Sequence, residues 1–84
     1  MHVEPDWRPI GPNDMKQGEV VIVQPPDYEG LYVTVEVREL RDDFVVFHAG
    51  KLNWSVICWI DQRGRILDDT HREVRTFAYE GEEL

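Results

Sequence analysis

Two stretches of the chain follow a period of two, and this pattern limits the fold more than any other feature. Successive side chains of a β-strand point to opposite faces of the sheet, so residues 31–40 and 54–61 are both predicted to be strands. The first is expected to turn inward Leu31, Val33, Val35 and Val37, and outward Tyr32, Thr34, Glu36 and Arg38. The second is expected to turn inward Trp54, Val56, Cys58 and Ile60, and outward Ser55, Ile57, Trp59 and Asp61.

Shorter apolar runs predict three further extended segments. A β-branched run occupies residues 19–24, and apolar runs follow at 44–49 and 65–67. The apolar parity changes at Glu39–Leu40, which predicts a β-bulge or the end of that strand. Asp42–Asp43 then favours a turn.

The last segment is consistent with two structures. Thr70 and Glu73 match a helix capping box, and Val74, Phe77 and Ala78 follow at helical spacing. The same region is rich in residues that favour strands. We expect a strand over 73–80, because a barrel needs a closing strand to cover its edge.

Five or six short strands in a chain of 84 residues predict an all-β fold. The strands are expected to form a small SH3-like barrel or a strongly bent antiparallel sheet, with a short C-terminal helix as the variant. A single domain fits this length. The predicted organisation is an extended proline-rich arm at 1–15, one barrel domain at 16–80 and an acidic tail at 81–84.

Part of the first half resembles the KOW motif of ribosomal and transcription-elongation proteins. The likeness lies in Lys16–Val23, Tyr28–Gly30, Val33 and Val35, about 20 residues in which a strand leads through a glycine-containing loop to a second strand. The resemblance implies a small SH3-like barrel, and with it RNA or ribosome binding. The chain departs from the motif at Pro25–Pro26, and its loop is acidic where the motif has basic residues.

The charge balance bears on the partners. Seventeen acidic against nine basic residues give a net charge of −8, which opposes the approach of duplex DNA and of anionic membranes. No apolar run is long enough to span a bilayer, and the N-terminus lacks the pattern of a secretion signal. With one cysteine, no disulfide framework forms within the chain, so a cytoplasmic protein is expected.

No set of residues has the spacing of a catalytic or metal site. His2, His48, His71 and Cys58 lie at none of the usual ligand spacings. Cys58 is expected to be a buried, unreactive core residue. We therefore expect no enzyme, no metal and no cofactor.

The aromatic residues are the more informative set, because nine of them exceed what so small a core can hold. Tyr32 and Trp59 fall on outward positions of their strands, and Tyr28 falls in a loop. We expect these three to form a partner-binding surface, completed by Trp7 from the arm. The alternative is that Trp59 packs beneath the arm beside Trp7.

These observations favour a non-enzymatic protein-binding module, with a homodimer left open. Small acidic single-domain proteins of this kind are commonly phage-encoded inhibitors or adaptors that act by stoichiometric binding. A first alternative is a DNA mimic whose carboxylates imitate phosphates, namely Asp27, Glu29, Glu36, Asp42, Asp43, Asp68 and Asp69. A second alternative is nucleic-acid binding through the mildly basic middle of the chain, with Lys51, Arg63 and Arg65 beside Trp54 or Trp59.

Overall fold

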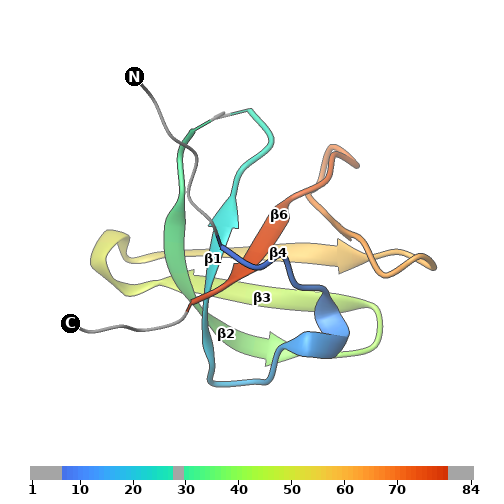
Figure 1. Ribbon diagram of the computed structural model, residues 1–84, viewed down its shortest axis with the longest axis horizontal. Helices are drawn as coiled ribbons and strands as arrows, with labels where there is room; N and C mark the ends of the chain where they lie inside the picture. The colour runs from blue at the N-terminus through green and yellow to red at the C-terminus, as the bar shows by residue number, and fades with distance from the viewer. Residues whose placement is uncertain (1–6, 28–29, 80–84) are drawn as a thin grey trace.

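Six antiparallel strands form one curled sheet in the computed structural model, which describes residues 7–27 and 30–79 (Figure 1). The sheet order is β5-β4-β3-β2-β1-β6. The strands are β1 (Val20–Gln24), β2 (Val33–Leu40), β3 (Phe44–Ala49), β4 (Trp54–Ile60), β5 (Ile66–Leu67) and β6 (Arg75–Ala78). The 3-10 turns η1 (Pro12–Asp14) and η2 (Gly50–Leu52) are the only helical elements in these ranges. The all-β prediction is confirmed.

The chain segment before β6 brings the two ends of the sheet together. β6 pairs with β1, while the N–H of Val74 donates to the carbonyl of Ile66 at 2.8 Å and the N–H of Asp68 to that of Arg72 at 2.9 Å. The sheet therefore curls into a half-barrel consistent with a small SH3-like barrel. The helical alternative for the segment after Thr70 is wrong, because these backbone groups pair with β5 and β1 instead.

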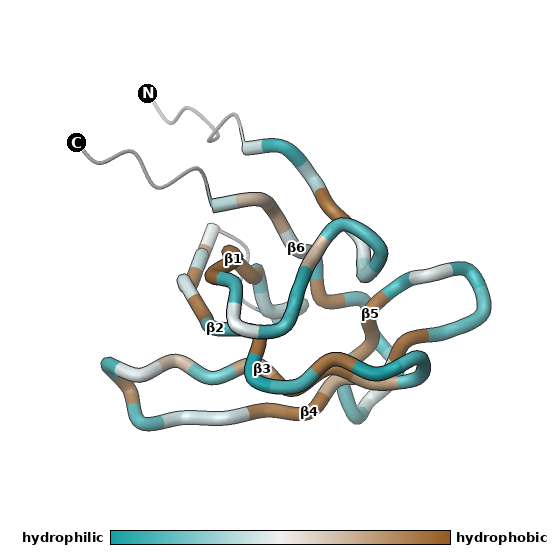
Figure 2. Tube along the Cα trace, turned by 90° about the horizontal axis from the view of Figure 1, so that it is seen from below, coloured by the Kyte–Doolittle hydropathy of each residue, from teal (hydrophilic) through white to brown (hydrophobic). Residues whose placement is uncertain are grey.

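Alternation along the strands places the core as predicted at most positions. Valines and Phe47 dominate the fully buried side chains, which are Val21, Val35, Val37, Val45, Phe47 and Cys58. Two inward predictions are wrong. Leu31 is 45% exposed because it precedes the first residue of β2, and Trp54 is 40% exposed because it lies where the β3–β4 hairpin projects beyond the body (Figure 2).

The parity change at Glu39–Leu40 predicted a β-bulge or the end of the strand, and the structure has both: a bulge in β2 and the end of β2 at Leu40. Val37 pairs with Phe47, but the next paired residue is Glu39, opposite Val46. The extra residue, Arg38, reverses the parity of the strand. Leu40 consequently faces inward and packs against the core.

The N-terminal arm lies along the outer edge of β6. Ile10 N–H donates to the Thr76 carbonyl at 3.0 Å, and Ala78 N–H donates to the Arg8 carbonyl at 2.9 Å. The Thr76 hydroxyl donates to the Ile10 carbonyl at 2.6 Å, and Pro9 forms a bridge with Phe77. The arm thus covers one edge of the sheet with main-chain hydrogen bonds.

Within the described residues, no helix is long and apolar enough to cross a membrane.

Candidate protein-binding face

The outer surface of β3 and β4 is built from three directly opposed residue pairs. Phe44 lies opposite Trp59, Val46 opposite Ile57, and His48 opposite Ser55. Opposed residues of an antiparallel pair share one side of the sheet. The neighbouring positions Val45, Phe47 and Cys58 are buried on the other side, so these six side chains point away from the core. We call them the β3–β4 face: Phe44, Val46, His48, Ser55, Ile57 and Trp59.

Four of the six residues are apolar, and two of these are substantially exposed. Trp59 retains 44% and Ile57 retains 42% of its accessible surface, while Phe44 and Val46 are half-buried. The rings of Phe44 and Trp59 meet edge to face with centroids 6.3 Å apart. Leu67 of β5 lies opposite Trp59 and extends the apolar surface. Large contiguous apolar surfaces are common at protein interaction sites, so this face is the candidate site.

Polar groups border this apolar centre. At the end near η2, His48 Nδ1 and Ser55 Oγ are hydrogen-bonded at 2.7 Å. On the neighbouring strand β2, Glu36 pairs with Arg38 at 3.6 Å and Glu39 with Arg41 at 2.9 Å. An apolar centre with a charged rim is the usual composition of a protein interface.

Carboxylates surround the Trp59 end of the face. Asp42 and Asp43 directly precede Phe44, and Asp69 follows shortly after Leu67. All three are exposed, and no ion pair of the described residues includes them. This end therefore carries three carboxylates that form no ion pair with the described side chains.

Two other aspartates nearby are used to hold turns. Asp61 accepts hydrogen bonds from the backbone N–H of Arg65 at 2.8 Å, from Arg65 Nε at 2.9 Å and from the N–H of Arg63 at 3.0 Å. The Arg65 N–H contributes most to holding the pKa of Asp61 below its usual value. At Asp68, burial opposes ionisation, but hydrogen bonds from Thr70 and Arg72 outweigh it and lower the pKa. Both groups organise the chain rather than face a partner.

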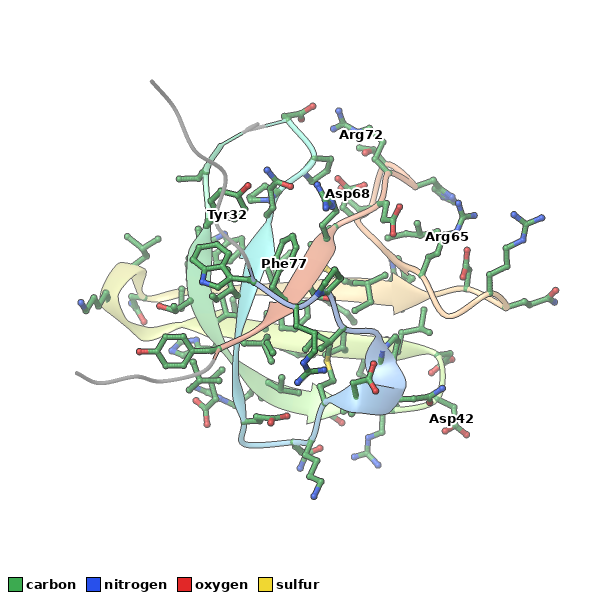
Figure 3. All side chains as sticks on the ribbon, in the orientation of Figure 1. Tyr32, Asp42, Arg65, Asp68, Arg72 and Phe77 are labelled. Atoms are coloured by element: carbon green, nitrogen blue, oxygen red, sulfur yellow. The ribbon has the colours of Figure 1, made fainter. Side chains whose placement is uncertain are left out.

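A second aromatic cluster lies at β6, where it holds the arm. The Trp7 ring meets Tyr32 edge-on with centroids 4.8 Å apart, and the Phe77 ring lies 6.0 Å from each of them. The Arg75 guanidinium lies 5.2 Å from the Phe77 centroid. Figure 3 shows Tyr32 and Phe77 directed toward one another beneath the arm. We call Trp7, Tyr32 and Phe77 the arm clasp.

The structure divides the partner surface expected from the sequence. Trp7 and Tyr32 meet in the arm clasp, whereas Trp59 lies beside Phe44 near the far end of β2. Tyr28 lies outside the described residues. Trp59 does not pack beneath the arm, since 44% of its surface is exposed. Alternation had placed Ile57 on the outward side with Trp59, but sequence reasoning missed Phe44 and Val46, which the β3–β4 register brings beside them.

The residues of the alternative nucleic-acid surface also lie apart. Lys51 and Trp54 belong to the β3–β4 turn and the start of β4, while Arg63 and Arg65 belong to the turn after β4 (Figure 1). In addition, Arg65 already forms an ion pair with Asp61 at 2.9 Å. The set does not form one basic surface.

The carboxylates proposed as phosphate mimics are partly occupied and lie apart. Arg72 binds Asp27 through both guanidinium nitrogens, and Glu36 pairs with Arg38. Asp42 and Asp68 occupy separate corners of the molecule in Figure 3. Glu29 lies outside the described residues.

Cys58 lies on β4 directly behind the face. It is 1% exposed, as the sequence predicted. Burial, with a smaller contribution from Asp68 and Asp69, raises the pKa of its thiol from 9.0 to about 11. The thiol is therefore uncharged at neutral pH and a poor nucleophile.

Comparison of the chain with protein-family models, curated proteins and solved structures finds no match. The face is therefore interpreted from its own chemistry.

Proposed function

We propose that this protein is a non-enzymatic binding module that docks a partner protein on its β3–β4 face. The observation that carries the proposal is the adjoining exposure of Trp59 and Ile57 on a rigid pair of strands. Tryptophan anchors are the most enriched residues among interface hot spots. Two long, paired strands hold such an anchor in place, so little side-chain order is lost on binding.

The charges around the face support a protein partner over a nucleic acid. Asp42, Asp43 and Asp69 stand near Trp59, and no ion pair of the described residues includes them. Unpaired carboxylates repel phosphates and attract lysine or arginine side chains. The favoured partner therefore offers an apolar pocket for Trp59 with basic residues at its border. An inhibitor or adaptor that works by occupying a basic protein surface would meet this description.

The test is capture from a lysate of the source organism with three immobilised proteins: wild type, Trp59→Ala and Trp54→Ala. Trp54 is the matched control because it lies on the same strand, is 40% exposed and points away from the face. Loss of a tryptophan anchor costs about 2 kcal/mol or more, roughly 30-fold in affinity. We expect a partner that Trp59→Ala loses and Trp54→Ala keeps.

Nuclease treatment of the lysate separates the two classes of partner. Capture that survives nuclease and depends on Trp59 supports the proposal. Capture that nuclease abolishes indicates nucleic-acid binding, and equal capture by Trp59→Ala and wild type removes the face from the function.

A further inference from the structure

One stretch of sheet edge is open. The arm covers the outer edge of β6 through Arg8 and Ile10. At the opposite end of the sheet, β5 covers only Trp59 and Ile60 of β4. The first part of β4, from Trp54 to Cys58, thus has β3 on one side and no strand of the described chain on the other.

The hydrogen-bond pattern identifies the backbone groups on this open edge. Ile60 N–H donates to the Asp43 carbonyl on the β3 side at 2.9 Å, while Asp61 N–H donates to the Arg65 carbonyl on the β5 side at 3.0 Å. Successive residues of a strand direct their backbone groups to alternate sides. Following this alternation back along β4, Ser55 and Ile57 direct their N–H and C=O groups into the open edge.

The sequence of this open edge contains none of the features that usually prevent an edge strand from pairing with another strand. Natural edge strands are usually protected by lysine, proline, a bulge or a covering segment, and the stretch Trp-Ser-Val-Ile-Cys has no charge and no proline. Figure 2 shows the β3–β4 hairpin projecting from the body, with β4 along the border of the molecule. A second strand can therefore reach the backbone of Ser55 and Ile57 from this side.

A second copy of the chain fits the edge in one antiparallel register. Pairing centred on Val56 sets Ser55 opposite Ile57 of the second copy, and the reverse. Both members of each pair have their backbone groups on the open edge, which gives about four intermolecular hydrogen bonds. A register shifted toward Trp59 is blocked, because Leu67 already pairs there.

The charges at the two ends of the open stretch complement one another in this arrangement. Lys51 lies in η2 at the hairpin tip, and Asp69 lies just beyond β5 at the opposite end. Both are exposed, and no ion pair of the described residues includes either. Antiparallel twofold pairing brings the hairpin tip of each copy beside the turn containing Asp69 of the other.

From these observations we infer that the protein forms a symmetric homodimer through the open edge of β4, centred on Val56. The dimer places the two β3–β4 faces side by side on one continuous sheet, because opposed residues share a side. The inference rests on backbone geometry and does not require the proposed function. It gives that function a doubled docking surface.

The first test removes the edge donor without touching the core. In Ser55→Pro the missing N–H is one that β3 does not use, and proline is tolerated on edge strands. Ser55→Ala is the matched control, since it also loses the hydrogen bond to His48 but keeps the N–H. Sedimentation velocity over about 1 µM to 1 mM, at about 0.15 M salt to screen the net charges, measures the dimer fraction.

We expect concentration-dependent dimers for wild type and Ser55→Ala, and monomers for Ser55→Pro with an unchanged circular dichroism spectrum. A wild type that stays monomeric to about 1 mM overturns the inference and leaves the edge to an extended segment of another protein. Dimers that persist in a folded Ser55→Pro also overturn it, because they form elsewhere.

A charge exchange tests the register and does not depend on the proline variant. Lys51→Asp and Asp69→Lys should each weaken the dimer about threefold to tenfold, since two exposed ion pairs are lost by symmetry. The double variant has the net charge of the wild type and should recover most of the affinity. Single variants that dimerise like the wild type, or a double variant that stays weak, contradict the register.

Discussion

The arm clasp and the β3–β4 face both contain aromatic clusters on the outside of the sheet, but the arm covers only the first of them. At the clasp, Trp7 covers Tyr32 and Phe77, and the arm adds main-chain hydrogen bonds to β6. At the face, Trp59 has Phe44 beside it and remains 44% exposed. The same residue type therefore packs under the arm in one place and remains exposed in the other.

The arm at the clasp covers an edge of the sheet. Both surfaces lie next to an edge of the sheet, and an open edge invites pairing. The arm closes the β6 edge with a segment that contains Pro9. β4 has no such cover along Ser55–Ile57, so the exposed aromatic surface and the open backbone edge occur on the same strand.

The largest expected difference between the two clusters concerns their phenylalanines. Phe77 is 6% exposed and contacts both other rings of the clasp, so Phe77→Ala should lower the free energy of unfolding by about 3 kcal/mol or more. Phe44 is half-buried at the rim of the face, and Phe44→Ala should cost about 1 kcal/mol. Chemical denaturation measures both. Equal losses would show that the two clusters contribute alike to the fold.

The second largest expected effect is the pH dependence of stability that arises from Cys58, and it tests whether water is excluded from the core behind the β3–β4 face. The pKa of the Cys58 thiol is raised from 9.0 to about 11 by burial, so the unfolded chain loses this proton at lower pH than the folded protein. Stability should therefore fall as pH rises from about 9 to about 11, by on the order of 2 kcal/mol. Below this window the contribution is fully present.

Cys58→Ala provides the control for this titration. Its stability at neutral pH drops through the lost packing, but the part of the alkaline decline that belongs to Cys58 should disappear. A thiol reagent at neutral pH should label the wild type only after unfolding. Rapid labelling of the native protein, or an identical alkaline decline in both proteins, would mean that water reaches the inner side of β4.

The arm contact should have an intermediate effect. Trp7 is half-buried and meets both other rings of the clasp, so Trp7→Ala should cost about 1–2 kcal/mol of unfolding free energy. Amide hydrogen exchange shows where stability is lost. The amides of Ile10 and Ala78 donate hydrogen bonds between the arm and β6, and both should lose protection. The Ile60 amide, bonded within the β3–β4 side, should not change. Uniform loss of protection would contradict a separate clasp.

The strands could be predicted from the sequence because alternation is a local property. The parity change near Leu40 likewise predicted the bulge, and Cys58 was correctly placed inside. The clasp could not be predicted, because the contact of Trp7 with Phe77 depends on how far the sheet curls. Alternation also predicted that Trp59 faces outward. It could not identify Phe44 and Val46 as neighbours of Trp59, because the register between two strands cannot be read from either strand alone.

The smallest expected change in stability is at Trp59, and it separates the two clusters most sharply. Trp59 is 44% exposed, and its aromatic contact is an edge-to-face approach to Phe44 at 6.3 Å. Trp59→Ala therefore removes less buried surface than Trp7→Ala, because Trp7 is half-buried. We expect a loss of about 1 kcal/mol or less, against the larger cost of Trp7→Ala. Trp54→Ala should cost a similar amount, because its exposure of 40% is comparable. Denaturation of the three variants under one condition makes the comparison. A loss of several kcal/mol for Trp59→Ala would place this ring with the core residues and remove the reason for regarding the face as a docking surface.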